Sequence, residues 1–396
     1  PKPLQLVSSR WEFQDANWFP DFPTAAEKIR WFWSHAGQPT LDGVVAVNSS
    51  ILEKLLAITG PIDMPEYGKI VNAQNVMLET QKAVELEYDK TENKPKKFVG
   101  ELVAKVLERV RHASGQDLAN YATVFAMALE TKEIQIALSD AEEESQIEAW
   151  GWNGRLLPTP GDALAVVEAN IAGQKTDGVI EEHVHNEAAI QEDGTIVDTV
   201  TLKRSHRGQM GELFHGANNV AYIRMYVPEG SELISASGFH PPEPSFFKAT
   251  LPDDPVDPDV ARLIIRESRD PSSQVVVTDE FGRTAFGGWV QLAPGSASTM
   301  TLRYRLPFRA QDLNRTVSSG TMEGGSEQAA YMMLLTSQSG KANRTITSSL
   351  TVPPTWRSSW SHTPFVASTT ELLWDRDQVF AHVFETSHVE ATSTSL

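Results

Sequence analysis

The sequence contains no cysteine in its 396 residues. Without thiols the chain forms no disulfide bond, holds no thiolate-bound zinc and uses no cysteine nucleophile. Disulfide-stapled scaffolds, thiolate zinc domains and cysteine hydrolases are therefore excluded together. The absence is compatible with a bacterial surface protein but does not by itself assign a compartment.

Positive charge is also scarce, because 34 lysine and arginine residues stand against 52 aspartate and glutamate residues and give a net charge of −18. Such a surface repels the phosphates of nucleic acids and of anionic lipids, so we expect neither as a partner. No apolar run approaches the roughly 18 to 20 residues that span a bilayer. The chain begins at Pro1 without a recognisable signal peptide. We expect a processed fragment whose original start, and any anchor with it, lies upstream of this chain.

The length predicts two or three domains, and the 40% of hydrophobic and 22% of charged residues are typical of a globular protein. The character of the sequence changes near residue 175. We predict a multidomain α+β chain, with an α/β region at residues 1–175, a β-sandwich at 176–312, a second β-sandwich or added sheet at 326–388, and a polar tail at 389–396. Glycine and serine in residues 316–327 indicate a linker between the two β regions.

Helical periodicity dominates the first region. Residues 49–58, 95–111 and 116–129 carry apolar side chains at helical spacing, and short β-like runs occupy residues 43–47 and 134–138. Alternating strands and helices indicate an α/β layer.

Alternating apolar and polar residues dominate the rest of the chain and predict antiparallel β-sandwiches. The predicted strands are residues 199–203, 221–227, 274–278, 289–292, 300–304, 331–336, 344–352 and 378–384. Few prolines or charges protect residues 346–352 and 379–384, so we expect self-assembly or protein partners at these strand edges or at the tail.

Residues 15–24 read Asp-Ala-Asn-Trp-Phe-Pro-Asp-Phe-Pro-Thr. This block resembles the signature of the bacterial domain of unknown function 4012 family. The resemblance continues at residues 41–47, 55–62, 151–154, 168–177 and 224–231. The family has no established activity, and its members usually carry an N-terminal membrane anchor. The resemblance therefore implies the C-terminal portion of a longer membrane-anchored precursor, whose missing front part is a further candidate partner.

A more distant similarity is to the LytR-CpsA-Psr glycopolymer transferases. Residues 42–62 match their strand and helix, and the resemblance implies an incomplete α/β layer of that kind at the front of the chain. Their arginine-rich stretch for a lipid pyrophosphate corresponds here to a lysine-only stretch that contains Lys90, Lys96 and Lys97. Because lysine is a point charge and lacks the bidentate fork of arginine, transferase activity is not expected.

Three acidic residues, Asp15, Asp21 and Asp42, are candidate ligands of a divalent cation, since hard cations prefer carboxylate oxygens. The competing interpretation is turn and cap chemistry near Pro20 and Pro23. The same two interpretations apply to the aspartates of a proline-rich loop, Asp253, Asp254, Asp257 and Asp259.

His183 and His185 lie two residues apart, so that a strand would place both imidazoles on one face, as in some zinc sites. Without a clear third histidine, a solvated strand face is the alternative. Aromatic residues are dense near the start of the chain, where they predict either a core or a platform for stacking carbohydrate: Trp11, Phe13, Trp18, Phe19, Phe22, Trp31, Phe32 and Trp33.

The sequence carries no Gly-x-Ser-x-Gly elbow, Walker loop or dinucleotide fingerprint. We therefore expect a cell-surface structural or assembly protein without catalytic activity or cofactor of its own. The alternative is a protein that handles glycans, either as a transferase-like enzyme acting on lipid pyrophosphates or as a glycan-binding module of the cell envelope.

Overall fold

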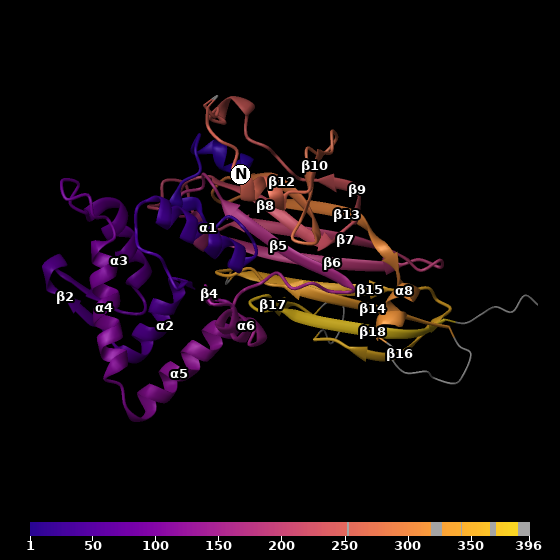
Figure 1. Ribbon diagram of the computed structural model, residues 1–396, viewed down its shortest axis with the longest axis horizontal. Coiled ribbons are helices and arrows are strands. Elements are labelled where there is room, and N and C mark those ends of the chain that lie inside the picture. Colours follow the sequence, from indigo (N-terminus) through magenta and orange to yellow (C-terminus); the bar gives the residue numbers. More distant parts are fainter. Residues whose placement is uncertain (252, 318–326, 342, 365–369, 387–396) are drawn as a thin grey trace, which may run out of the picture. The chain divides into compact units, whose positions relative to one another are not determined.

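The computed structural model describes residues 1–251, 253–317, 327–341, 343–364 and 370–386 (Figure 1). The chain divides into two compact units. The first, here called the sheet unit, comprises Pro1–Asp21 and Leu156–Leu396, and the second, the helical unit, comprises Phe22–Arg155. Helices dominate one unit and large sheets the other, which confirms the prediction of a multidomain α+β chain.

The helical unit contains six α-helices: α1 (Phe22–His35), α2 (Ser50–Thr59), α3 (Val76–Lys82), α4 (Lys97–Arg111), α5 (Gly115–Glu130) and α6 (Ala141–Ala149). A π-helical turn, η4 (Ala83–Glu87), follows α3, and a 3₁₀ turn, η3 (Pro65–Tyr67), joins two short strands. The predicted helices at residues 49–58, 95–111 and 116–129 correspond to α2, α4 and α5. No helix in the described part of the chain is both long and apolar enough to span a membrane.

Two strand pairs complete this unit. The strands β1 (Gly43–Val47) and β4 (Ile134–Leu138) pair antiparallel, as do β2 (Ile62–Met64) and β3 (Lys69–Val71). Apolar faces of α2 and α4 meet in the core, where Leu56 and Leu102 are buried. The sequence also sets the helix ends: α2 stops at Gly60, whose φ of +72° suits glycine, and the Asp140 carboxylate caps the first N–H groups of α6.

The sheet unit contains two large sheets (Figure 1). The eight-stranded sheet has the order β10 (Arg266–Arg269), β11 (Val276–Glu280), β12 (Arg283–Leu292), β8 (Asn219–Pro228), β5 (Asp162–Asn170), β14 (Glu327–Thr336), β18 (Gln378–Thr386) and β16 (Trp356–His362). The six-stranded sheet has the order β17 (Leu372–Leu373), β15 (Arg344–Thr351), β6 (Ile180–Ile190), β7 (Thr195–His206), β13 (Ala297–Arg309) and β9 (Glu232–Ser237).

Short helices occupy the connections of this unit: η1 (Lys2–Leu6), η2 (Phe13–Asp15), η5 (Thr176–Val179), η6 (Pro244–Phe246), α7 (Pro258–Leu263) and α8 (Ala310–Val317). The inward side chains of both sheets form one hydrophobic core, in which Val184, Ile223, Leu302 and Trp374 are fully buried. Each of the eight strands predicted in this part of the sequence overlaps an observed strand.

The unit boundaries differ from the predicted ones. Strand β5 falls within the predicted α/β region but lies at the centre of the eight-stranded sheet. Strands β14 and β15 pair parallel with β5 and β6, so residues beyond 326 extend the same two sheets instead of forming a second sandwich. Such pairing joins residues more than 150 positions apart, and local sequence patterns carry no signal for it. The predicted linker lies mostly outside the described residues, as does the tail at 389–396.

Among the described residues, one of the two expected strand edges is paired and the other is largely open. Strand β18 is paired by β14 on one side and, from Ala381 onward, by β16 on the other, so residues 381–384 do not form a sheet edge. Strand β15 is paired along its length by β6 and covered by β17 only at Thr345 and Ile346. Of the strands that the structure describes, β16 and β10 are the edge strands of the eight-stranded sheet, and Trp360 on β16 keeps 54% of its surface in solvent.

Candidate functional site

The three candidate cation ligands are divided between the two units. Asp15 and Asp21 belong to the sheet unit and Asp42 to the helical unit, and each takes part in local structure. The carboxylate of Asp21 is buried and accepts the backbone N–H of Leu156 at 3.0 Å. Burial raises the pKa of Asp15, which ends the short helix η2. Asp42 belongs to the helical unit, where its backbone carbonyl accepts the N–H of Ser139. Within the described ranges, no three histidine, aspartate or glutamate side chains are grouped so that they could hold a metal ion.

The lysine stretch lies on the surface of the helical unit, at the start of α4. Lys96 and Lys97 are exposed, and Lys97 lies 3.6 Å from the carboxylate of Glu92. Lys94 pairs with the same carboxylate at 2.9 Å, and Lys90 is exposed in the preceding turn. These lysines are exposed, and at least two of them are balanced by an acidic neighbour.

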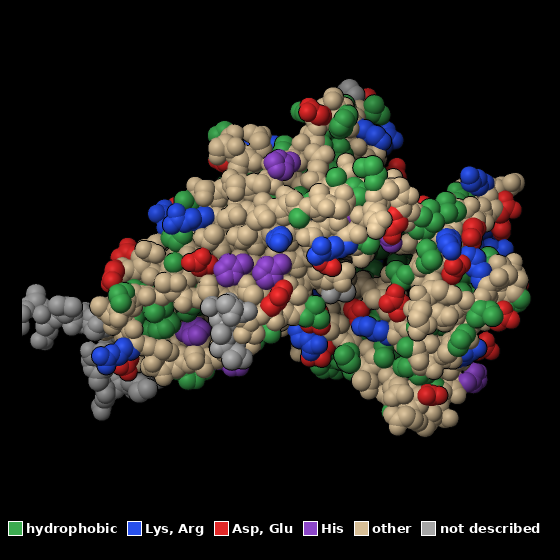
Figure 2. Space-filling view, turned by 180° about the vertical axis from the view of Figure 1, so that it is seen from behind, with side chains coloured by type: hydrophobic (Ala, Val, Ile, Leu, Met, Phe, Trp, Pro, Cys, Tyr) green, Lys and Arg blue, Asp and Glu red, His purple; other side chains and the backbone are tan. Residues whose placement is uncertain are grey.

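His183 and His185 occupy one face of β6, as the predicted strand requires. The Nδ1 atom of His183 lies 3.2 Å from the hydroxyl of Thr345, and that of His185 lies 2.8 Å from the hydroxyl of Thr347, both on the neighbouring strand β15. Glu371 approaches His183 at 2.9 Å. Histidine side chains lie next to one another on the face of this unit seen in Figure 2. His183, His185 and Glu371 are not grouped so that they could hold a metal ion, and the partners of the two imidazoles on β15 are hydroxyls.

The aspartates of the proline-rich loop also serve local structure. Asp257 caps α7 by accepting the N–H groups of Asp259 and Val260, and Asp259 lies 3.6 Å from Arg262. Asp254 accepts the N–H of Leu251 and pairs with Arg10 at 3.2 Å. This loop therefore shows turn and cap chemistry at these positions.

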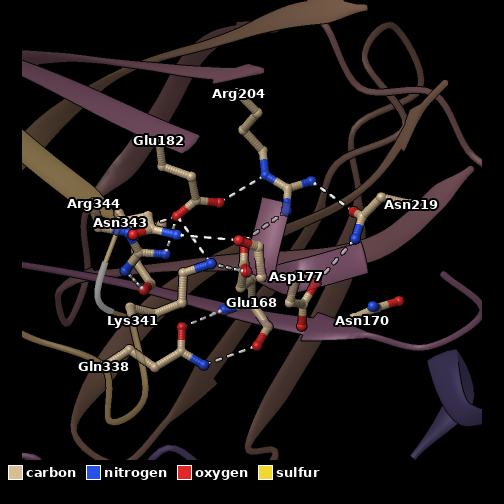
Figure 3. A network of polar contacts seen from close by, with 12 residues as sticks. Glu168, Asn170, Asp177, Glu182, Arg204, Asn219, Gln338, Lys341, Asn343 and Arg344 are labelled. Carbon is tan, nitrogen blue, oxygen red and sulfur yellow. Dashed lines mark hydrogen bonds and ion pairs between the residues drawn. The ribbon is translucent and has the colours of Figure 1, made fainter. Parts of the chain in front are cut away.

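A buried ionic network joins the two sheets of the sheet unit (Figure 3). Glu182 on β6 lies at its centre, and its carboxylate accepts Nε of Arg204 at 2.7 Å and Nε of Arg344 at 2.8 Å. Arg204 continues to Glu168 on β5 at 2.8 Å, and Lys341 contacts both glutamates. The side chains of Glu182, Arg204 and Arg344 are completely buried.

The pKa values of the two glutamates of the network shift in opposite directions. Burial alone would raise the pKa of Glu182, but the charges of Arg344, Lys341 and Arg204 lower it well below its ordinary value. Burial raises the pKa of Glu168, and Arg204 offsets only part of that effect. Because each of these charges has an opposite charge as its partner, the network braces the two sheets.

A second buried acidic group lies between the sheets. Asp162 on β5 accepts the hydroxyl of Tyr331 at 2.5 Å, and Asp198 on β7 is its acidic neighbour. Both side chains are inaccessible to solvent. Burial raises the pKa of Asp162 to about 6, and burial together with the charge of Asp162 raises that of Asp198 well above its ordinary value. At neutral pH this pair therefore retains a proton inside the core.

An open pocket of about 670 Å³ lies wholly within the sheet unit. Its floor is the outer face of the eight-stranded sheet, formed by alternate residues of β8, β10, β11 and β12. On β8, Ile223 and Met225 point into the core, so Tyr222 and Arg224 point the other way, onto this floor. The volume is typical of a site for a small organic ligand.

Aromatic rings line this pocket. The ring of Tyr222 lies 6.3 Å from Trp18, nearly parallel to it, and 5.2 Å from Trp289, whose ring in turn lies 5.6 Å from Phe247. Gly287 makes room for them, because a Cβ atom there would lie 2.3 Å from the hydroxyl of Tyr222. The pocket is therefore lined by aromatic rings together with polar side chains, and Tyr222 and Trp289 keep 7% and 8% of their surface in solvent.

Two chain segments form the walls. One is the segment that contains η1, and the other is the loop between β9 and β10, which includes Phe247. They are joined to each other by a hydrogen bond from the Lys248 N–H to the carbonyl of Gln5, and to the sheet by the ion pair between Lys2 and Glu267 at 2.5 Å. The His240 N–H donates to the carbonyl of Trp289 and fixes the start of the loop.

The dense aromatic group of the sequence divides between core and pocket. Phe19 and Phe22 are buried, as a core position predicts, whereas Trp18 lines the pocket and Trp31 is 42% exposed. Tyr222, Arg224 and Trp289 were not predicted as site residues. Alternation along β8 and β12 does not show which outer sheet face other segments of the chain will cover. The aromatic residues Tyr222 and Trp289 on those outer faces were the sequence feature that could have indicated a pocket.

Several solved structures match parts of the chain at low similarity. An M1 zinc metallopeptidase variant from Deinococcus radiodurans, bound to a Tyr-Ser-Ala substrate, is 11% identical with a TM-score of 0.21. That match covers 52% of this chain and 42% of the peptidase chain, less than half of its length. A second match is a protein from Legionella pneumophila described as a "putative nutrient binding protein". It is 6% identical with a TM-score of 0.21, over 57% of this chain and 73% of the other. No curated protein matches the chain.

One protein-family model matches the front of the sequence. The match covers residues 3–84, which include the block at residues 15–24 and the strand–helix segment at 42–62. The later blocks that resemble the family lie outside the matched residues. Residues 3–84 thus match the family described as "Protein of unknown function (DUF4012)".

Proposed function

We propose that this chain is a non-catalytic protein of the bacterial cell surface that binds glycan in the pocket of its sheet unit. The observation that carries the proposal is the arrangement of Trp18, Tyr222, Phe247 and Trp289 around the pocket. One face of a sugar ring carries mainly C–H groups and packs on aromatic rings, while its hydroxyl groups need hydrogen-bonding side chains nearby. The pocket supplies both.

The polar groups of the pocket favour binding over catalysis. Burial raises the pKa of Tyr222 to about 12, so its hydroxyl stays protonated at neutral pH and is a poor base. Glu267 pairs with Lys2, and Glu280 accepts hydrogen bonds from Tyr226 and Thr278. Carboxylates with such partners orient a ligand more readily than they transfer protons.

The net charge of −18 and the strand-rich unit also suit a surface protein that assembles with other proteins. The exposed strand β16 offers an edge for such contacts, and Trp360 on it supplies apolar surface. Assembly at this edge and glycan binding in the pocket use different elements, so each can be tested without the other.

The glycan proposal is tested by isothermal titration calorimetry of the whole chain with chitotetraose, cellotetraose and a hyaluronan tetrasaccharide. We expect at least one of the three to bind and Trp289→Ala to weaken that binding at least about 10-fold, because the ring forms part of the stacking surface. Trp360→Ala removes an exposed tryptophan outside the pocket and is the matched control. Equal binding by both variants, or binding of none of the three sugars, contradicts the proposal.

A further inference from the structure

The arginine on the floor of the pocket has unused hydrogen-bonding capacity. Arg224 is 95% buried, since only 5% of its surface is exposed. Its guanidinium group lies 4.3 Å from the centroid of the Trp18 ring, and Nη2 donates to the carbonyl of Trp18 at 2.8 Å. Nε and Nη1 are buried and find no acceptor among the described residues.

Arg204, a buried arginine of the same unit, has hydrogen-bond acceptors for all three of its guanidinium nitrogens. Its Nε, Nη1 and Nη2 atoms donate to Glu182, Asn219 and Glu168 in turn. Arg224 has no carboxylate within ion-pair distance in the described part of the chain, although Glu280 lines the same pocket. A buried cation without an anion is costly, and the cost falls when a ligand supplies the missing acceptor.

We propose that Arg224 selects a sugar that carries an anionic group, so that the pocket binds an acidic glycan in preference to a neutral one. This inference rests on the proposed function, because it concerns the same pocket. The sugar ring lies against the aromatic rings, and its carboxylate or phosphate pairs with the guanidinium group of Arg224, which lines the pocket. Charge-assisted hydrogen bonds of this kind are stronger than those to a neutral hydroxyl.

The charges around the pocket agree with this assignment. Its cationic side chains are Lys2, Arg224 and Arg269, and its anionic ones are Glu243, Glu267 and Glu280. Three positive and three negative groups balance there, although the whole chain carries −18. An anionic ligand therefore meets less repulsion in the pocket than over the average surface of this protein.

Three disaccharides that differ only at carbon 6 of the non-reducing sugar test the inference: cellobiose, cellobiouronic acid and cellobiose 6′-phosphate. Titration of the whole chain by calorimetry should show at least one of the two acids binding about 10-fold or more tightly than cellobiose. The stronger of the two acids identifies the anionic group as carboxylate or phosphate. Arg224→Met keeps much of the apolar stem over Trp18 and should bind all three disaccharides alike.

Arg269→Gln is the matched control, because it removes another positive charge from the pocket and leaves Arg224 in place. It should retain most of the preference for the acid. If cellobiose binds as tightly as both acids, the role of Arg224 is wrong while glycan binding stands. If none of the three binds, the role of Arg224 is wrong, and glycan binding in this pocket stands or falls with the tetrasaccharide titrations. Should Arg224→Met not fold, the comparison of the three ligands on the natural chain still decides.

Discussion

Glu182 is the residue on which the brace between the two sheets depends. Its carboxylate is completely buried and receives hydrogen bonds from Arg204 and Arg344. Removing one partner of a buried ion pair leaves the others charged and desolvated, which typically costs about 3–5 kcal/mol. We therefore expect Glu182→Ala to lower the free energy of unfolding by about that amount, measured by urea denaturation.

The preceding residue on the same strand provides the control. Glu181 pairs with Arg207, but the two side chains are 54% and 62% exposed. An exposed pair contributes about 0–1 kcal/mol, so Glu181→Ala should change stability little. Equal destabilisation by both substitutions would show that the network contributes nothing beyond a surface ion pair.

The acidic pair between the sheets predicts a dependence of stability on pH. The pKa of Asp162 is about 6 in the folded chain against 3.8 in the unfolded one, and that of Asp198 is raised well above 3.8. A carboxyl group with a raised pKa contributes its full stability below about pH 4 and loses that contribution as pH rises through the folded pKa. This pair therefore destabilises the fold progressively above about pH 4.

Asp198→Asn removes the titrating group that has no arginine beside it. The difference in melting temperature, Asp198→Asn minus natural chain, should become more positive from pH 5 to pH 8. Thermal unfolding followed by circular dichroism at these pH values measures it. Asp193→Asn, in the exposed turn before β7, is the control for a general effect of charge. A difference that is constant with pH would mean that folding does not raise the pKa of Asp198.

At the scale of elements, the strand pair β9–β13 depends on a glycine. Gly238 follows β9 with a φ of +83°, and a Cβ atom there would lie 2.1 Å from the backbone oxygen of Thr299 on β13. Backbone cannot move aside as a flexible side chain does. Gly238→Ala should therefore cost both the about 1–2 kcal/mol of left-handed strain and a further about 1–3 kcal/mol of overpacking.

Substitution of Gly295, in the turn before β13, distinguishes the cost of backbone strain from that of overpacking. Its φ is +75°, but a Cβ atom there meets no other atom within 4 Å. Gly295→Ala should cost only the strain. Urea denaturation of the two variants measures the difference, and similar losses would show that the pairing of β9 with β13 adjusts to the extra methyl group.

At the scale of the whole molecule, the two units have separate hydrophobic cores. Trp374 is completely buried in the core of the sheet unit, and Leu102 is completely buried in that of the helical unit. Truncating either side chain should cost about 2–5 kcal/mol in its own unit. We expect Trp374→Ala and Leu102→Ala each to shift a different part of the calorimetric unfolding profile. If both substitutions shift the whole profile together, the units unfold as one.

Local sequence patterns predicted many elements of this chain but not all. The apolar stripes of α2, α4 and α5, the Gly60 stop of α2 and the alternation of β7 and β13 are all set by neighbouring residues. Strand β5 was not predicted from the sequence. It is buried on both faces, so its residues do not alternate between apolar and polar. The front block at residues 15–24 was enough to indicate the family that the match at residues 3–84 supports.

Tertiary structure alone decided where the units divide and where the pocket lies. Parallel pairing of β14 with β5, and of β15 with β6, brings the end of the chain into sheets that start near residue 162. The same folding places Trp18 beside Tyr222 and Arg224, more than 200 positions away. Sequence patterns report the environment of a residue through its near neighbours, whereas burial, unpaired donors and ring contacts depend on which distant strands meet.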